Sequence, residues 1–339
     1  MRLSDFDFPF DPSLIATQPI VPRDQARLLV LDRQSGQMMH YRVSDLPSLL
    51  VPGDVVVVNN TKVLPARIVG IKRPSGRPVE VLFVKNLADT VWQVMVKGRF
   101  RPQQVIELPQ GARATILQRD AEGTVVKVDS PLPIRHLLQQ YGMMPLPPYM
   151  KRRSIRQDYE WYQTVFAVHE GSIAAPTAGL HFTNDLLARL AARAIDIVAI
   201  TLHVGPGTFR PVVTEHIEDH RMEGETFKVE AEVAQAILRA KQTGRRVIAV
   251  GTTVVRTLET VALKYGRIIP TQGESHLFIT PGFRFLAVDA LMTNFHLPKT
   301  TLLMLVSAFA GIEFVRRAYE EAVKERYRFY SYGDAMLIL

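Results

Sequence analysis

Residues 246–265 read RVIAVGTTVVRTLETVALKY, and this stretch indicates the fold of the chain. The apolar run Arg246–Val250 has the composition of a buried strand, and Thr252–Tyr265 has the periodicity of a helix. The same order of strand, loop and helix recurs through the C-terminal half, so we expect an α/β layer with a substantially parallel sheet. The other elements that support it are the predicted strands Ile195–His203 and Phe285–Met292 and the predicted helices Asn184–Ala194, Ala231–Thr243, Lys299–Ala310 and Ile312–Tyr327.

The N-terminal half carries short strands instead. β-Branched residues recur from about Arg67 to Asp129 between turns rich in Gly, Pro or Asp, which predicts a small, mostly antiparallel barrel or a sandwich. A proline-rich stretch, MPLPPY at 144–149, follows as a stiff linker. We therefore expect an α/β domain made of residues 1–64 and 152–339, interrupted by a small β-barrel domain at 65–151.

Composition narrows the classes of function. The 339 residues contain no cysteine, which excludes disulfides, thiolate nucleophiles and Cys-based metal sites. The longest apolar run, Thr301–Ala310, is shorter than the roughly 20 residues of a membrane span, so we expect a cytoplasmic protein without membrane association. The formal charge of +8 favours a phosphate-rich partner, although a solvated basic face is the alternative. The basic groups are Arg73, Arg77, Lys85, Lys97, Arg99, Arg101 and Arg113 in the strand region, and Lys151, Arg152, Arg153 and Arg156 behind the linker.

Four segments combine small residues with groups that bind ligands or transfer protons. Ligands of parallel α/β sheets sit outside the carboxyl ends of the strands, where such loops lie. At Gly251-Thr252-Thr253 a strand runs into a helix N-terminus, a site for a carboxylate or phosphate with Arg256 one turn further on. The alternative there is an ordinary helix cap, with Arg256 paired to a nearby acid. The segments are Ala174–Phe182, Thr201–Arg210, Gly251–Glu259 and Thr293–Thr300.

Three of these segments contain a histidine: His181, His203 and His296. Each histidine alone fits a hydrogen-bonded structural residue, but together the segments predict one shared pocket. The sequence does not complete a zinc motif. His216 and His220 have the spacing of a helical zinc pair, but Ile217 stands where that motif needs Glu. We expect no metal.

Several strings resemble a known family over nearly the whole length. They include LSDFD at 3–7, RLLVLDR at 27–33, NNTKVLPAR at 59–67, PLPPY at 145–149, YQTVFA at 162–167 and YRFYSYGDAM at 327–336. With the four loops, they resemble the S-adenosylmethionine:tRNA ribosyltransferase-isomerases of queuosine biosynthesis. The resemblance implies an α/β domain interrupted by a small β-barrel. It also implies transfer of the ribosyl group of S-adenosylmethionine, the co-substrate, onto a 7-aminomethyl-7-deazaguanine at the tRNA wobble position. The ribose is rearranged, adenine and methionine leave, and epoxyqueuosine-tRNA is formed.

This chemistry suggests roles for particular residues. A base must remove an acidic C–H beside the sulfonium and an acid must protonate adenine, tasks that suit imidazoles. We expect proton transfer by His203 and His296, with His181 behind them and Asp334 and Glu259 as carboxylate alternatives. The expected contacts to S-adenosylmethionine are Gly205, Gly207, Thr208, Phe209, Thr252, Thr253, Arg256, Asn294 and Tyr332. The expected tRNA contacts are Lys151, Arg152, Arg153, Arg156 and Arg210.

One stretch departs from the family pattern. Where the family often has His-x-Met-His-x-Glu, residues 220–225 read HRMEGE, so Glu223 replaces the second histidine and no imidazole acts there. Two other classes of protein remain open: a non-catalytic tRNA-binding module, and an S-adenosylmethionine-dependent tRNA methyltransferase. We expect a monomer or a weak homodimer.

Overall fold

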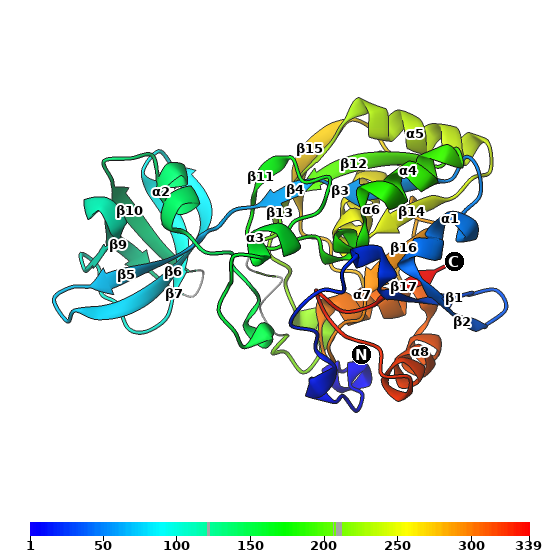
Figure 1. Ribbon diagram of the computed structural model, residues 1–339, viewed down its shortest axis with the longest axis horizontal. Coiled ribbons are helices and arrows are strands. Elements are labelled where there is room, and N and C mark those ends of the chain that lie inside the picture. The colour runs from blue at the N-terminus through cyan, green and yellow to red at the C-terminus, as the bar shows by residue number, and fades with distance from the viewer. Residues whose placement is uncertain (121–122, 206, 208–211) are drawn as a thin grey trace. The chain divides into compact units, whose positions relative to one another are not determined.

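The computed structural model divides the chain into two compact units, drawn in Figure 1. It describes residues 1–120, 123–205, 207 and 212–339. The α/β unit comprises Met1–Thr61, Thr164–His169 and Ala175–Leu339, and the barrel unit comprises Lys62–Gln163 and Glu170–Ala174. The expected fold class, an α/β domain interrupted by a small antiparallel β-barrel, is therefore confirmed.

The barrel unit runs past residue 151, the end expected from the sequence. The Tyr159 hydroxyl donates a hydrogen bond to the carbonyl of Gly142, and Ile155 N–H donates to the buried carboxylate of Asp158 at 2.8 Å. The first bond ties the segment after the proline-rich stretch to the residues before that stretch, and the second stabilises the segment itself. The proline-rich stretch is therefore not a boundary between the units.

A nine-stranded mixed sheet is the centre of the α/β unit. Its four middle strands, β12, β3, β14 and β16, are parallel, and β17 runs antiparallel beside β16. Strands β3, β14 and β16 are buried along their whole length, as a sheet covered on both faces requires. In sheet order the strands are β15 (Thr271–Ser275), β13 (Glu225–Val229), β12 (Asp196–Leu202), β3 (Val55–Asn59), β14 (Val247–Val250), β16 (Ala290–Asn294), β17 (Ala335–Ile338), β1 (Arg27–Leu31) and β2 (Met38–Arg42).

Helices pack on this sheet through their apolar residues. Leu46 of α1 and Leu186 and Leu190 of α4 join one core with Val56 and Ile248 of the central strands. Helices α5 and α6 contact β3, β12 and β14 and lie outside that core, and α7 and α8 pack against each other. The helices are α1 (Leu46–Leu49), α4 (Asn184–Ala192), α5 (Ala231–Gln242), α6 (Thr252–Tyr265), α7 (Thr301–Ala310) and α8 (Ile312–Lys324). Within the described residues, no helix combines the length and apolar character needed to cross a membrane.

The predicted strand Phe285–Met292 is wrong over its first half, because the strand observed is Ala290–Asn294. The backbone N–H groups of Leu286, Ala287 and Val288 donate to the buried carboxylate of Glu259 at 2.8–3.0 Å. Those donors are thereby withdrawn from any strand ladder, and a contact with a distant helix overrides the local pattern.

Six antiparallel strands of the barrel unit close on themselves in the order β10-β7-β6-β5-β8-β9. A Cβ on Gly70 would lie only 2.6 Å from the Cγ2 of Ile106, so glycine is what lets β5 approach β8. The strands are β5 (Arg67–Lys72), β6 (Arg77–Ala88), β7 (Val91–Val96), β8 (Val105–Glu107), β9 (Arg113–Arg119) and β10 (Thr124–Asp129), followed by α2 (Ile134–Tyr141) and α3 (Asp158–Trp161). A separate pair consists of β4 (Thr61–Val63) and β11 (His169–Ser172).

Candidate active site

The carboxyl ends of the four parallel strands meet at one edge of the sheet, here called the carboxyl edge. β3, β12, β14 and β16 end at Asn59, Leu202, Val250 and Asn294. Because β17 is antiparallel to β16, its first residue, Ala335, lies opposite Asn294 at the same edge. The loops that follow these strand ends are therefore neighbours, as the sequence predicted for a parallel sheet.

His203 follows the last residue of β12 and is half buried. Its Nδ1 lies 2.8 Å from the Oγ1 of Thr61, a hydroxyl that is fully buried. Asn59 fixes the backbone on both sides of this contact, because its Oδ1 accepts the N–H group of Leu202, which precedes His203, and the N–H group of Thr61, at 3.1 Å each. Burial, and to a lesser extent His169, lowers the pKa of His203, so the ring is neutral at neutral pH.

His181 and Asn294 form a second group at this edge. The Nδ2 of Asn294 lies 3.1 Å from the Nε2 of His181 and also donates to the carbonyl of Tyr330 at 3.1 Å. The Oδ1 of Asn294 is buried and has no hydrogen-bond partner among the residues that the structure describes. Burial lowers the pKa of His181 to about 4, although the charge of Asp334 acts in the opposite direction. The pair therefore combines a neutral imidazole with an unused amide acceptor.

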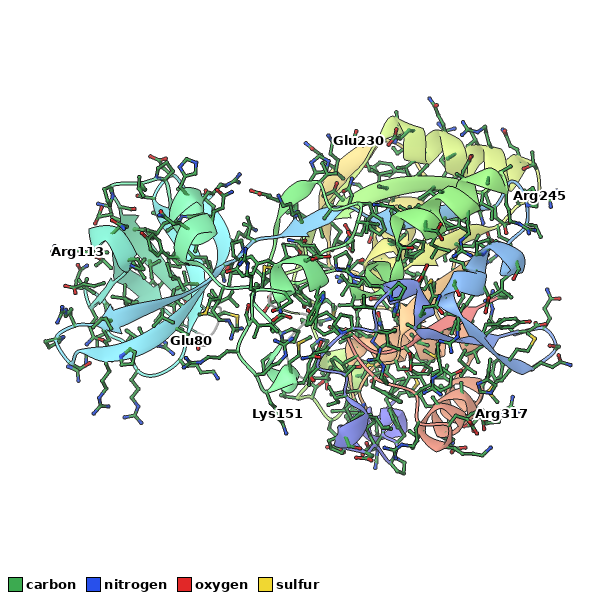
Figure 2. All side chains as sticks on the ribbon, in the orientation of Figure 1. Glu80, Arg113, Lys151, Glu230, Arg245 and Arg317 are labelled. Atoms are coloured by element: carbon green, nitrogen blue, oxygen red, sulfur yellow. The ribbon has the colours of Figure 1, made fainter. Side chains whose placement is uncertain are left out.

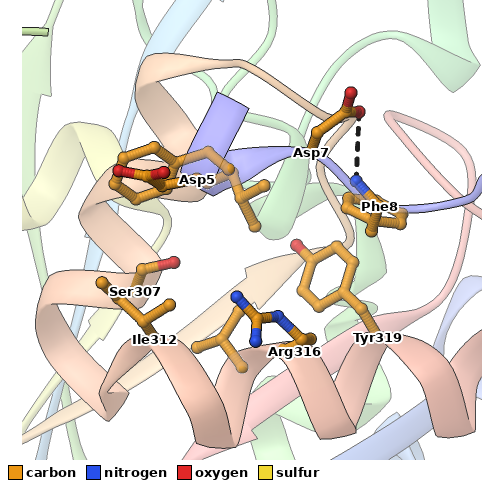
Figure 3. Close-up of a pocket in the computed structure, with 10 residues that line it drawn as sticks. Asp5, Asp7, Phe8, Ser307, Ile312, Arg316 and Tyr319 are labelled. Atoms are coloured by element: carbon orange, nitrogen blue, oxygen red, sulfur yellow. Dashed lines mark hydrogen bonds between the residues drawn. The ribbon is translucent and has the colours of Figure 1, made fainter. Parts of the chain in front are cut away.

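His296 is also buried and follows Asn294 by two residues. Its Nε2 is 3.0 Å from the Oγ1 of Thr293, and its backbone N–H donates to the Tyr319 hydroxyl at 2.9 Å. Burial lowers the pKa of His296 to about 3 and raises that of Tyr319. Tyr319 also faces a small surface recess of about 20 Å³, whose other labelled walls include Ser307 and Arg316 (Figure 3). His296 is thus a buried, neutral residue whose ring bonds to Thr293 and whose backbone bonds to Tyr319.

Asp334 lies at the carboxyl edge, but its oxygens are engaged by the backbone. It accepts the N–H groups of Arg27 at 2.9 Å and Arg328 at 2.8 Å. These bonds close the turn that leads into β17, in which Tyr332 is buried and Tyr330 adopts a positive φ of 70°. Asp334 therefore shapes this edge and acts on His181 through its charge.

Glu259 and Arg256 do not reach the carboxyl edge as free side chains. Glu259 binds the loop that precedes β16, and so points to the amino end of that strand. Arg256 pairs with Glu225, both side chains being more than nine-tenths buried, and its Nε donates to the carbonyl of Leu277 at 3.0 Å. Of the two interpretations of Arg256, the structure shows the guanidinium paired with a nearby acid.

The helix start at Thr252 does lie at the carboxyl edge. Gly251 has a φ of 90°, which directs the chain from β14 into α6, and no side chain within the described residues caps the helix. Thr253 Oγ1 accepts from the Nδ2 of Asn59 at 3.3 Å, which ties the helix start to the His203 group. First-turn N–H groups at a helix start form a site for an anion.

The glycine-rich loop after His203 is described only in part. Gly205 N–H donates to the Oε1 of Glu225 at 3.0 Å, and Gly207 packs beside Glu223, the residue that departs from the family pattern. The predicted site residues Thr208, Phe209 and Arg210 lie outside the described residues.

The expected tRNA contacts at residues 151–156 belong to the barrel unit. Arg152 forms a bidentate pair with the buried carboxylate of Asp158, at 2.6 and 2.7 Å, so its guanidinium holds the segment together. Lys151, Arg153 and Arg156 are exposed. They, and not Arg152, are therefore the freely exposed cations of this segment, of which Lys151 is labelled in Figure 2.

The histidine pair considered for zinc is not on one helix face. His216 and His220 flank the three-residue 3₁₀ helix Ile217–Asp219, and both have extended backbones. Within the described residues, no three His, Asp or Glu side chains are grouped as metal ligands.

The fold and its polar edge define the chain as a two-unit α/β protein with a candidate ligand site at the carboxyl ends of parallel strands. The chain belongs to the family described as queuosine biosynthesis protein, whose sequence profile matches residues 3–338. The family resemblance read from the sequence is therefore confirmed.

Similar proteins match over their full lengths. Two relatives are named S-adenosylmethionine:tRNA ribosyltransferase-isomerase. One, from Symbiobacterium thermophilum, is 50% identical, and the other, from Sulfurihydrogenibium, is 47% identical; each match covers 100% of this chain and 100% of the relative. A crystal structure described as S-adenosylmethionine tRNA ribosyltransferase from Thermotoga maritima is 35% identical, with a TM-score of 0.56, and covers 99% of this chain and 100% of its own.

Proposed function

We propose that this chain is an S-adenosylmethionine:tRNA ribosyltransferase-isomerase. It transfers and rearranges the ribosyl group of S-adenosylmethionine onto the aminomethyl group of a 7-deazaguanine at the tRNA wobble position, and adenine and methionine leave. The observation that carries the proposal is that all three histidine-bearing segments reach the carboxyl edge, in a chain about half identical to relatives of that name.

The residues at the carboxyl edge fit S-adenosylmethionine. The buried Oδ1 of Asn294 is an acceptor without a donor, and a ribose hydroxyl or an adenine amine would satisfy it. The N–H groups of Thr252 and Thr253 would hold the methionine carboxylate. When bound, S-adenosylmethionine supplies an activated ribosyl group with two leaving groups.

Proton transfer is assigned to His203 first. Its Nδ1 is engaged by Thr61, so Nε2 is the atom that takes a proton and returns it. Its ring is half buried, whereas His181 and His296 are almost fully buried and have pKa values of about 4 and about 3. Those two rings stay neutral at neutral pH and serve as hydrogen-bonding walls of the site.

We assign tRNA binding to the barrel unit, because the net positive charge of the chain is concentrated in that unit. Residues 62–163 and 170–174 contain 17 Lys and Arg against 9 Asp and Glu, a net +8. The α/β unit holds 24 of each kind and is formally neutral. A polyanion is attracted to the unit that carries the excess. We further propose action in the cytoplasm as a monomer or weak homodimer.

The test is adenine release from S-adenosylmethionine in the presence of tRNA carrying the aminomethyl-deazaguanine. His203→Ala should abolish release because it removes the group that transfers the proton, and His296→Ala should lower release because it removes a hydrogen-bonding wall of the site. Circular dichroism should show an intact fold for each variant. His276→Ala is the matched control, because that side chain is 63% exposed, and it should keep normal turnover. Near-normal turnover in both variants would contradict the assignment of roles. Formation of S-adenosylhomocysteine would indicate a methyltransferase, and tRNA binding without adenine release would indicate a non-catalytic module.

A further inference from the structure

Two cations lie against one aromatic ring in the barrel unit, and three more are within three residues of that ring in the sequence. The Nζ of Lys72 lies 4.2 Å from the centre of the Phe100 ring, and the Cζ of Arg119 lies 5.7 Å from it. Lys72 also donates a hydrogen bond to the carbonyl of Arg99, which joins the end of β5 to the loop between β7 and β8. We call this group the Phe100 cluster, and it consists of Lys72, Lys97, Arg99, Phe100, Arg101 and Arg119.

The cations of the Phe100 cluster have no acidic partners within the residues that the structure describes. None of the five forms an ion pair with a described residue, whereas other cations of the same unit do: Arg73 pairs with Glu107 at 2.6 Å, and Arg67 with Glu80 at 3.4 Å. Four of the five are exposed, Lys72 being half buried. Like charges held together without counter-charges repel one another, and an anionic partner relieves that repulsion.

The loop that carries the cluster is held in place by backbone contacts. Gln103 N–H donates to the carbonyl of Ile116 at 2.8 Å, and Ile116 N–H donates to the carbonyl of Gln104 at 2.9 Å. Arg101 N–H donates to the Gln104 side chain at 2.9 Å. The Phe100 ring adds cation–π contacts to Lys72 and Arg119. The cations are thus presented from an ordered loop, which reduces the entropy lost when a ligand binds.

We propose that the Phe100 cluster of the barrel unit binds the sugar–phosphate backbone of the tRNA, whereas the base reacts at the carboxyl edge of the α/β unit. This inference rests on the proposed function, which supplies the tRNA. Closely spaced phosphates match five unpaired cations, and arginine forks suit phosphate oxygens. Binding here is therefore strongly salt-dependent and independent of the base at the wobble position.

The size of the effect follows from counterion release. Each phosphate contact to duplex RNA or DNA adds about 0.9 to the slope of log affinity against log salt. Removing three contacts lowers that slope by about 2.7, so between 50 and 200 mM salt the native protein loses roughly 40-fold more affinity than the variant.

The experiment compares two triple variants of the full chain. The first, Lys97→Gln/Arg99→Gln/Arg101→Gln, removes loop cations of the cluster. The matched control, Lys264→Gln/Arg284→Gln/Arg317→Gln, removes three exposed charges of the α/β unit. Binding of fluorescein-labelled tRNA with an ordinary guanine at the wobble position is followed by anisotropy from 50 to 200 mM KCl. Polyglutamate of similar charge is the competing probe.

The proposal predicts a lower salt slope for the cluster variant and an unchanged slope for the control. Equal slopes in all three proteins, or equal losses in both variants, would overturn it. Binding of polyglutamate as tight and as salt-dependent as that of tRNA would also overturn it, and would assign the cluster to an acidic protein. Adenine release is measured separately at 50 mM KCl. Adenine release together with equal salt slopes in all three proteins would overturn only this inference. The predicted difference in salt slope without adenine release would overturn only the proposed function.

Discussion

Replacing Glu225 by Gln should destabilise the α/β unit by about 3–5 kcal/mol, because it leaves the guanidinium of Arg256 buried without a counter-charge. The two side chains are 4% and 7% exposed, so water screens neither of them. Glu225 also accepts the N–H of Gly205 at 3.0 Å, and an amide oxygen can keep that bond. The loss is a large fraction of the roughly 5–15 kcal/mol that stabilises a typical protein.

A double-mutant cycle measured by urea denaturation isolates this pair. Arg256→Met alone should destabilise as strongly, and Glu225→Gln/Arg256→Met should be less destabilised than the sum of the two single variants by about 3 kcal/mol. The exposed pair Arg239–Asp196, 3.6 Å apart, is the matched control and should show no measurable coupling. Singles that unfold like the native protein, with weaker binding of S-adenosylmethionine in Arg256→Met, would refute the structural role and make Arg256 a ligand contact.

Three further predictions concern the carboxyl edge and its support. Thr61→Val should lower the rate of adenine release about tenfold or more with little change in KM, and Thr61→Ser should restore it; a normal pH–rate profile in Thr61→Val would contradict a positioning role for His203. The stability that comes from keeping His181 neutral is present above pH 6.5 and falls as the pH drops toward the folded-state pKa of about 4. His181→Asn should therefore remove about 2 kcal/mol of the loss in unfolding free energy that the native protein shows between pH 6.5 and pH 4.5. An unfolding free energy, measured in urea, that falls over this pH range as much in the variant as in the native protein would count against it. Glu259→Gln should destabilise by about 3 kcal/mol because three N–H donors lose a carboxylate, and a shift below about 1 kcal/mol would show that the loop before β16 is held otherwise.

Local patterns predicted most of the fold. The parallel order of β3, β12 and β14 follows from apolar runs that alternate with helices, and the barrel follows from short β-branched runs between turns. Contacts between distant segments decided where prediction failed. The N–H groups after Phe285 serve Glu259, which lies more than 25 residues earlier on a helix, and periodicity carries no trace of that contact.

The candidate site could be predicted as a set of loops but not as a set of bonds. The sequence placed His203 after a strand, yet its partner Thr61 lies 142 residues away. From the sequence, Arg256 fits either a ligand contact or an ion pair with a nearby acid, and its contact with Glu225 distinguishes the two. Asn59 ends the apolar run that forms β3 and Thr61 follows it, and the rule that places ligands at the carboxyl ends of strands was the one signal that could have found them.

The most direct test of the account follows the ribose carbon atoms. The native protein is incubated with S-adenosylmethionine labelled in the ribose and with tRNA carrying the 7-aminomethyl-7-deazaguanine, and the label in tRNA and the small-molecule products are measured together. If the chain transfers the ribosyl group, we expect one labelled group in tRNA for each adenine and each methionine released. Label that stays in S-adenosylhomocysteine, or adenine release without label in the tRNA, would contradict it.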